Sequence, residues 1–211
     1  MQRTRHHRSL RAVVVAAAAL AGLAVLPVAS LAAEVPRALR AWLHATDQSP
    51  TADQIRRASA HAQQELRAVA RDPKEHRYAR HRAVALLSRL ADPAAEAALL
   101  ELRSEPDAAL RATVAVALAA GPGARRPAQV IRGLEAWYPS QPADVRAAVA
   151  RGLAMIPDLA AARAAAVRLR KAEKDKALRQ QLDRVIRAGS RGGRSEAQRE
   201  GKAGRAVPKA R

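Results

Sequence analysis

The 211-residue chain contains no cysteine and no phenylalanine, and aromatic residues make up only 2% of it. Without cysteine there can be no disulfide, thiol nucleophile, cysteine-ligated zinc or iron–sulfur centre, covalently attached c-type haem or lipid-modified cysteine. The few aromatic rings offer little surface on which nucleic-acid bases could stack. Since alanine and leucine must supply the core, we expect stability to come from several similar units packed together.

The residue patterns that mark catalytic and metal sites are also missing. Beyond His6 and His7 near the N-terminus, the chain has four histidines, and none of them has a carboxylate partner at metal-binding spacing. We expect these four side chains to be solvated; they are His44, His61, His76 and His81. The chain has no Gly-x-Ser-x-Gly sequence, and no pair of carboxylates stands out. We therefore expect a protein that is not an enzyme, with no metal and no cofactor.

Other conspicuous residues have structural explanations. Gly121-Pro122-Gly123 is followed by arginines but lacks the Lys-Ser/Thr ending of a phosphate-binding loop, so we interpret it as a helix–helix turn. Asp107, Asp144 and Asp175 stand at expected helix starts, where an acidic side chain satisfies free backbone N–H groups.

A repeated spacing organises the middle of the chain. Ala79 to Asp92, ARHRAVALLSRLAD, has the same pattern as Val145 to Asp158, VRAAVARGLAMIPD. Counted from an arginine, a small or apolar residue stands at +3, an aliphatic residue at +7 and, in these two copies, another at +10. The arginines are Arg80, Arg111, Arg146 and Arg179, and the predicted core residues are Ala83, Leu87, Leu90, Val114, Leu118, Val149, Leu153, Ile156, Leu182 and Ile186. The helical spacing and an interval of 31 to 35 residues predict an all-α fold, an α-solenoid of about four antiparallel helix pairs.

One copy with its preceding helix also resembles a known family. Asp92 to Gly121, DPAAEAALLELRSEPDAALRATVAVALAAG, resembles the short HEAT-like repeats also found in relatives of phycobilin lyases. In such repeats Asp-Pro opens the first helix and an aliphatic–arginine pair opens the second. The resemblance covers about residues 74 to 188 and implies a repeat architecture, in which the motif arginines connect neighbouring repeats and the second helix of each pair lines a concave side. Families of this kind include binding scaffolds, carriers and a few enzymes, so the resemblance implies no reaction.

The first residues are typical of an export signal. Basic residues precede an uncharged apolar run, Ala12 to Leu26, which Pro27 ends, and Ser30-Leu31-Ala32 suits cleavage after Ala32. The alternative is an uncleaved membrane anchor, because residues 12–33 have no charge and are long enough to span a bilayer. We expect a bacterial protein that is exported, periplasmic or secreted, with no transmembrane span after cleavage.

The sequence divides into four segments. We expect a signal peptide over 1–32, N-terminal capping helices over 33–73, a HEAT-like repeat array over 74–187 and a disordered basic tail over 188–211. In the second segment a short helix, Glu34 to Ala45, covers an end of the array, and a capping box of Thr51 and Gln54 opens one helix that runs to about Asp72. The tail is rich in glycine and nearly without large aliphatic residues, so it cannot offset the entropy of ordering.

The chain is strongly basic, with 38 Lys and Arg against 19 Asp and Glu. Residues 33–187 hold 27 basic and 17 acidic side chains, and the tail holds seven and two, so both parts are basic. Such a field attracts acidic proteins, anionic lipid head groups and polysaccharide phosphates in a salt-dependent way. Export and the lack of aromatics mean that no nucleic acid is expected. The alternative is that the charge only solvates the surface and reflects an arginine-rich composition.

Positions +2, +5 and +9 define a candidate binding face, away from the +3 and +7 core positions. Its members are Arg82, Ala85 and Arg89, then Thr113, Val116 and Ala120, then Ala148, Arg151 and Met155, then Gln181, Arg184 and Ala188. We expect partner binding by Arg82, Arg89, Arg151, Met155 and Arg184, because arginines between small apolar patches suit an acidic, partly apolar peptide.

The expected function is that of a non-catalytic protein–protein interaction scaffold in the bacterial envelope, with an acidic protein as partner. Two alternatives remain. One is a basic protein that binds anionic lipid head groups or lipopolysaccharide through its body and tail. The other is a lyase-like or accessory enzyme of the repeat family.

Overall fold

The computed structural model describes residues 35–45 and 47–188, and their regular elements are all helical. The predicted signal peptide, the start of the predicted first helix and all but the first residue of the predicted tail lie outside these residues. The α-helices are α1 (Arg37–His44), α2 (Ala52–Ala58), α3 (Ala62–Arg71), α4 (Arg77–Leu90), α5 (Pro93–Glu101), α6 (Ala108–Ala120), α7 (Pro122–Arg125), α8 (Pro127–Trp137), α9 (Ala143–Met155), α10 (Leu159–Ala172) and a helix over residues 176–188. Short 3-10 turns, η1 (Leu102–Ser104) and η2 (Tyr138–Ser140), follow α5 and α8. Within the described residues, no helix is both long and apolar enough to cross a membrane.

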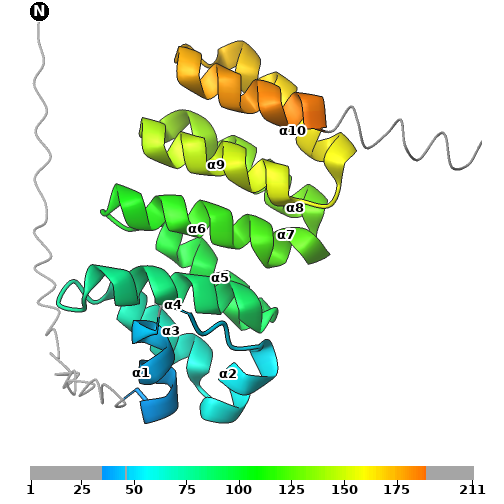
Figure 1. Cartoon of the computed structure of the whole chain (residues 1–211). Helices are drawn as coiled ribbons and strands as arrows, with labels where there is room; N and C mark the ends of the chain where they lie inside the picture. Colours follow the sequence, from blue (N-terminus) through cyan, green and yellow to red (C-terminus); the bar gives the residue numbers. More distant parts are fainter. Residues whose placement is uncertain (1–34, 46, 189–211) are drawn as a thin grey trace, which may run out of the picture. The chain divides into compact units, whose positions relative to one another are not determined.

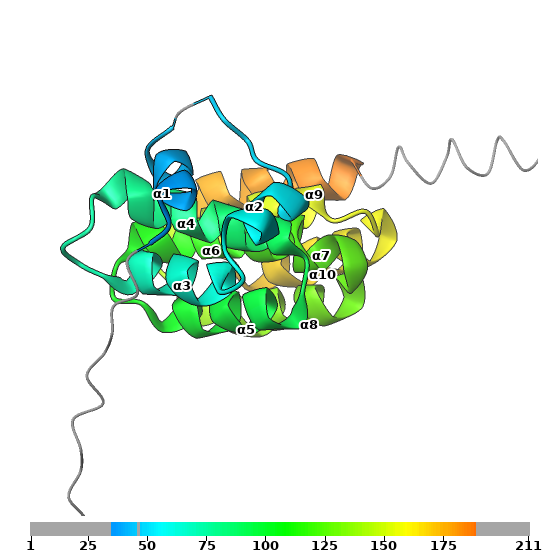
Figure 2. The same cartoon turned by 90° about the horizontal axis from the view of Figure 1, so that it is seen from below.

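The helices lie in two rows (Figures 1 and 2). In the row that we call the first row, α1 and α2 pack on α4, α4 packs on α6, and α6 packs on α9. In the other row α3 packs on α5, and α8 packs on α10. The chain alternates between the rows, so that α3 pairs with α4, α5 with α6 and α10 with α9. The all-α prediction is confirmed.

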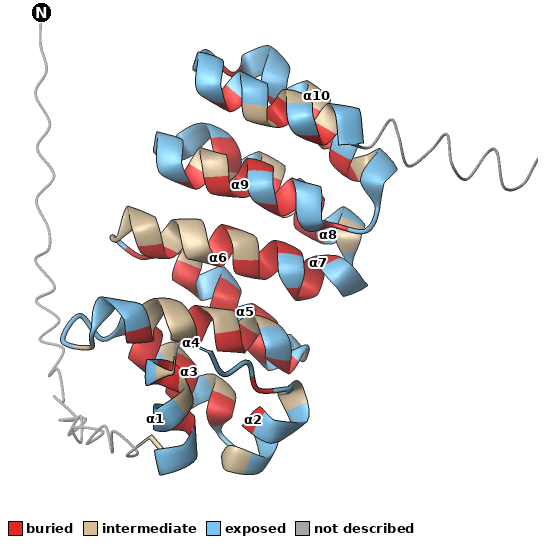
Figure 3. Ribbon diagram, in the orientation of Figure 1, coloured by how far each residue is buried: buried red, intermediate tan, exposed pale blue. Residues whose placement is uncertain are grey.

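The core includes the side chains that the repeated spacing singles out. The +3, +7 and +10 residues of α4, α6 and α9 are buried, as is Leu182, while Ile186 is half-buried. Buried residues recur along α4, α6 and α9 (Figure 3). Small residues bring these helices close together, because a Cβ on Gly152 would stand 3.0 Å from the Cβ of Ala119 in α6. At Gly121 a Cβ would stand 2.2 Å from the carbonyl oxygen of Ser88, so any other residue would push α6 away from α4.

Side chains at the helix starts act as predicted, with one exception. The Thr51–Gln54 capping box is present, and Asp107 and Asp175 accept hydrogen bonds from backbone N–H groups two and three residues on. Asp144 lies in the first turn of α9 without capping its backbone, because Pro142 is the residue that precedes the helix. Asp144 is therefore exposed and available to another group.

Two predicted elements differ from the structure. The single helix expected from Thr51 to about Asp72 is broken into α2 and α3, because Ser59 is extended and its hydroxyl accepts the N–H of His61. This local hydrogen bond competes with the helical one, which periodicity alone cannot reveal. The expected turn after Gly121 contains a short helix, α7.

Candidate functional site

The motif arginines connect each helix of the first row to the segment that precedes the next one. Arg80 of α4 donates to the carbonyl of Ala70 at 2.9 Å and pairs with Glu105 at 3.6 Å and Asp107 at 3.7 Å, just before α6. Buried Glu105 also accepts from Arg71 of α3 at 3.2 Å. The carboxylate of Glu105 thus joins both α3 and α4 to the segment that precedes α6.

The same contact recurs one and two intervals later. Arg111 donates from Nε to the side-chain oxygen of Gln141 at 3.1 Å, and Arg146 lies with its Nε 2.9 Å from Oε2 of Glu173. The contact of Arg146 Nε with Glu173 is an ion pair without hydrogen-bond geometry. The hydrogen bond between the two side chains runs from Arg146 Nη2 to Glu173 Oε1 at 3.4 Å. Arg179, on the last described helix, donates to the carbonyl of Lys174 at 3.4 Å. These contacts are those of scaffolding residues.

Arg146 and Glu173 belong to a buried network with Tyr138. The Tyr138 hydroxyl donates to Oε2 of Glu173 at 2.7 Å, and the Arg146 guanidinium lies 5.9 Å from the centre of the tyrosine ring. Burial and the bond to Glu173 raise the pKa of Tyr138, so it remains a donor. Burial acts to raise the pKa of Glu173, but the N–H of Asp175, the Tyr138 hydroxyl and Arg146 together lower it. The carboxylate therefore stays ionised and holds α9 to the segment after α10.

Two of the predicted partner-binding residues, Arg82 and Arg89, hold the N-terminal part of the chain. Arg82 is half-buried and its Nε donates to the carbonyl of Trp42 at 3.3 Å, while Arg89 donates to the carbonyl of Pro50 at 3.5 Å. The hydroxyl of Tyr78, which lies in α4 like Arg82 and Arg89, donates a hydrogen bond to the carbonyl of Ala45 at 3.0 Å. The face expected on α4 is therefore not free along its whole length: Arg82 is half-buried under α1, and Arg89 contacts the segment after α1 but remains exposed.

The +2 position faces the preceding helix, although Thr113, at this position of α6, also reaches the groove described below. Thr113 of α6 contacts His81 of α4, and Ala148 of α9 is completely buried. In a helix with 100° between residues, +2 is rotated from +5 toward the preceding helix, and the close approach of the helices buries it. The +5 and +9 positions remain exposed in α9, where they are Arg151 and Met155, and Arg184 is exposed on the last helix.

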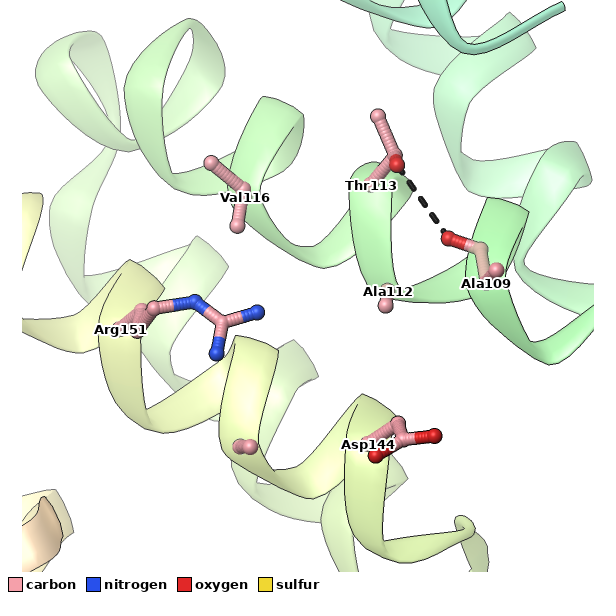
Figure 4. Close-up of a pocket in the computed structure, with 7 residues that line it drawn as sticks. Ala109, Ala112, Thr113, Val116, Asp144 and Arg151 are labelled. Carbon is pink, nitrogen blue, oxygen red and sulfur yellow. Dashed lines mark hydrogen bonds between the residues drawn. The ribbon is translucent and has the colours of Figure 1, made fainter. Parts of the chain in front are cut away.

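An open groove lies between α6 and α9 (Figure 4). It has a volume of about 480 Å³ and is lined by Ala109, Ala112, Thr113 and Val116 of α6 and by Asp144, Ala147 and Arg151 of α9. We call this set of residues the α6/α9 groove. Arg151 extends its guanidinium over the space between the helices, while the carboxylate of Asp144 points away from Arg151. No described acidic side chain pairs with Arg151, which is exposed.

Sequence reasoning found part of this groove. Thr113, Val116 and Arg151 belonged to the predicted face, whereas Ala109, Ala112, Asp144 and Ala147 did not. The missed residues stand at −2 and +1, which lie within about 60° of +5 on a helix. The available signal was alanine at +1 in two successive copies, Ala112 and Ala147, and at −2 in the first of them, Ala109.

His81 is the histidine for which the expected solvation is wrong. Its Nδ1 lies 2.6 Å from the hydroxyl of Thr113, which itself donates to the carbonyl of Ala109 at 3.2 Å. The hydroxyl must then accept from the ring, so Nδ1 carries the hydrogen, and Nε2 is a buried acceptor without a partner. Burial, together with Arg77 and Arg80, lowers the pKa of His81 against the opposing effect of Asp107. This favours a neutral ring between α4 and α6.

Among the described residues, no group of three or more His, Cys, Asp or Glu side chains is placed to hold a metal ion. The arrangement that remains is a groove with an apolar floor, one unpaired cation over it and one carboxylate at its end. In comparisons with protein-family models, with curated proteins and with solved structures, no match to this chain was found.

Proposed function

We propose that this chain is an exported, non-catalytic protein-interaction scaffold of the bacterial envelope, built as an α-solenoid of about four HEAT-like repeats. The observation that carries the proposal is the α6/α9 groove, which offers a guanidinium with no ion-pair partner among the residues that the structure describes, above small apolar side chains. An arginine over an apolar surface gains most when a partner removes it from water and supplies a carboxylate. The function is therefore binding, and the partner is an acidic protein.

The repeat architecture is supported by contacts that recur with the sequence interval. Arg80, Arg111 and Arg146 each reach a polar side chain in the segment before the next helix of their row. The +3 and +7 residues of these helices are buried in the same way. A repeat array stabilised between neighbours can leave one side of its row free for a ligand.

A second candidate function rests on the charge of the carboxyl-terminal part of the described structure. Residues 163–187 contain nine basic and three acidic side chains, and two of the acidic ones, Glu173 and Asp183, are already paired with Arg146 and Arg170. The remaining cations are exposed and precede a basic segment, 188–211. This part of the protein could bind anionic lipid head groups or lipopolysaccharide phosphates.

Affinity capture distinguishes the two functions. The full chain, expressed with its own leader and a carboxyl-terminal tag, is used to capture partners from envelope extract at low and at moderate salt. The scaffold proposal predicts a saturable protein partner that persists at moderate salt, since a desolvated arginine pair is screened less than an exposed one. Recovery of anionic lipid alone, lost as salt rises, would replace the scaffold by the surface-binding function.

The same preparation tests export. The intact mass of the envelope form should correspond to a chain that begins at Ala33, because Ser30-Leu31-Ala32 suits cleavage after Ala32. A membrane-bound species that retains Met1 would show that the leader is an anchor.

A further inference from the structure

The protein already holds an extended segment of its own on the first row. Three side chains of α4, Tyr78, Arg82 and Arg89, donate hydrogen bonds to main-chain carbonyls of Ala45, Trp42 and Pro50. Trp42 lies in the last turn of α1, and we call residues 45 and 47–50, which follow α1, the strap. It passes α4 on the side away from α3 and α5 (Figure 2).

The described backbone is extended at both ends of the strap. Tyr78 and Arg89 are separated by about 16 Å of helix rise. The five residue-to-residue steps from Ala45 to Pro50 reach at most about 17 Å when extended. Ala45 and Thr51, at the two ends, both have extended backbone angles. The chain therefore runs alongside α4, held by its carbonyls rather than by particular side chains.

The equivalent surface one and two intervals later has no such cover from the described residues. The positions of Tyr78 and Arg82 are occupied by Ala109 and Thr113 in α6, and that of Tyr78 by Asp144 in α9. Because most of these side chains are small, the helices leave the α6/α9 groove between them instead of reaching a strap.

We propose that the α6/α9 groove holds an extended acidic segment of a partner protein, with a carboxylate of that segment on Arg151. The inference rests on the proposed scaffold function and specifies its partner. Small side chains fit the floor, since Ala112, Val116 and Ala147 leave space for alanine or valine but bring no large pocket. The strap on α4 provides the precedent for an extended chain on this row.

Asp144 adds a constraint on the segment. It stands seven residues before Arg151, which is about 10 Å of helix rise, and three extended residues cover the same distance. Its carboxylate would repel a uniformly acidic segment. The best ligand therefore has a carboxylate at the Arg151 end and a hydrogen-bond donor three residues away, at the Asp144 end, with small apolar residues between them.

A synthetic probe tests this without knowledge of the natural partner. The probe is a short labelled peptide of alanine and valine with one glutamate and, three residues from it, one asparagine; a second peptide has glutamine in place of the glutamate. Fluorescence anisotropy at moderate salt should show binding of the first peptide by the wild-type protein. The Arg151→Glu variant should bind it about tenfold or more weakly. Wild-type protein should show a similar loss with the glutamine peptide.

Two variants separate groove binding from general attraction to a basic protein. Ala147→Leu keeps the charge but fills the floor, and should also weaken the probe. Arg132→Glu changes an exposed arginine of α8, in the other row, and should leave probe binding unchanged. Circular dichroism and a urea melt verify that each variant is folded. Equal losses in Arg132→Glu and Arg151→Glu, with full binding in Ala147→Leu, would overturn the groove proposal.

The groove proposal and the scaffold function can fail independently of each other. If Arg151→Glu and Ala147→Leu capture the natural partner as strongly as wild type, the groove proposal is overturned while the scaffold function stands. If the wild-type protein captures no saturable partner, the scaffold function fails, whatever the peptide does.

Discussion

At the scale of single residues, His81 links the stability of the protein to pH. Its folded pKa is lowered from the ordinary value of 6.5, because the ring is partly buried with an unpartnered Nε2 and stands near Arg77 and Arg80. As pH falls below about 6.5 the unfolded chain takes up this proton first, so stability is constant above that value and decreases as pH falls toward the folded pKa.

We therefore predict that the unfolding free energy from urea melts decreases as pH falls below about 6.5, and that His81→Gln flattens this slope. The carboxylates with lowered pKa, Asp107 and Glu173, lose their stabilisation at lower pH, as it falls below their ordinary values of 3.8 and 4.5 toward the folded ones. His44→Gln is the control, because His44 is exposed. An unchanged slope in His81→Gln would show that the ring takes up a proton freely in the folded protein.

Core leucines provide a second prediction at this scale. Leu118→Ala and Leu153→Ala should each lower the free energy of unfolding by about 2 to 5 kcal/mol, because both side chains are buried between packed helices. Leu159→Ala, at the exposed start of α10, should change it by about 0.5 kcal/mol or less. Equal losses at all three positions would mean that the repeated spacing does not define the core.

At the scale of elements, the helices are held in register by contacts between one helix and the segment before the next. Arg146→Ala removes the partner of buried Glu173 and leaves the carboxylate to Tyr138 and backbone N–H groups alone. We predict a loss of about 3 kcal/mol in urea melts, as for other broken buried ion pairs. Arg168→Ala, which breaks an exposed pair with Glu135, should have a much smaller effect. The reverse order would contradict the scaffolding role of the motif arginines.

The strap gives a second prediction for the elements. Tyr78→Phe combined with Arg89→Ala removes the two hydrogen bonds that α4 donates to the strap and leaves the one from Arg82 to Trp42 of α1. Amide hydrogen exchange should become faster over residues 47–58, which include α2, while α6 and α9 keep their protection. Arg125→Ala, on α7, is an exposed control. Unchanged exchange in the double variant would show that Pro50 and α2 hold the strap without these side chains.

At the scale of the whole molecule, the sequence determines the helices and their buried residues more plainly than the binding surface. The +3 and +7 spacing predicts Leu87, Leu118 and Leu153 in the core because burial follows directly from helical periodicity. The strap has no comparable signal, since α4 contacts its backbone and any sequence offers carbonyls. Arg82 and Arg89 were therefore expected on an open face, whereas the chain itself contacts both side chains and leaves only Arg89 exposed.

The location of the groove depends on the same tertiary arrangement. Whether a position such as +2 faces solvent or the preceding helix is decided by how closely the helices approach, and that follows from small residues such as Gly152 and Ala119. The described surfaces divide accordingly. Half-buried Arg82 and exposed Arg89 donate hydrogen bonds to the N-terminal part of the chain, whereas exposed Arg151 lines the α6/α9 groove.

The central claim is that this scaffold binds its partner in the α6/α9 groove. The most direct test is amide hydrogen exchange of the full chain, with and without the partner that it captures from envelope extract. The account predicts added protection over Ala108–Ala120 and Ala143–Met155, which form the groove, and little change over α8, Pro127–Trp137, in the other row. Protection of residues 176–188 alone, with α6 and α9 unchanged, would contradict the account and place the binding surface at the basic carboxyl-terminal end.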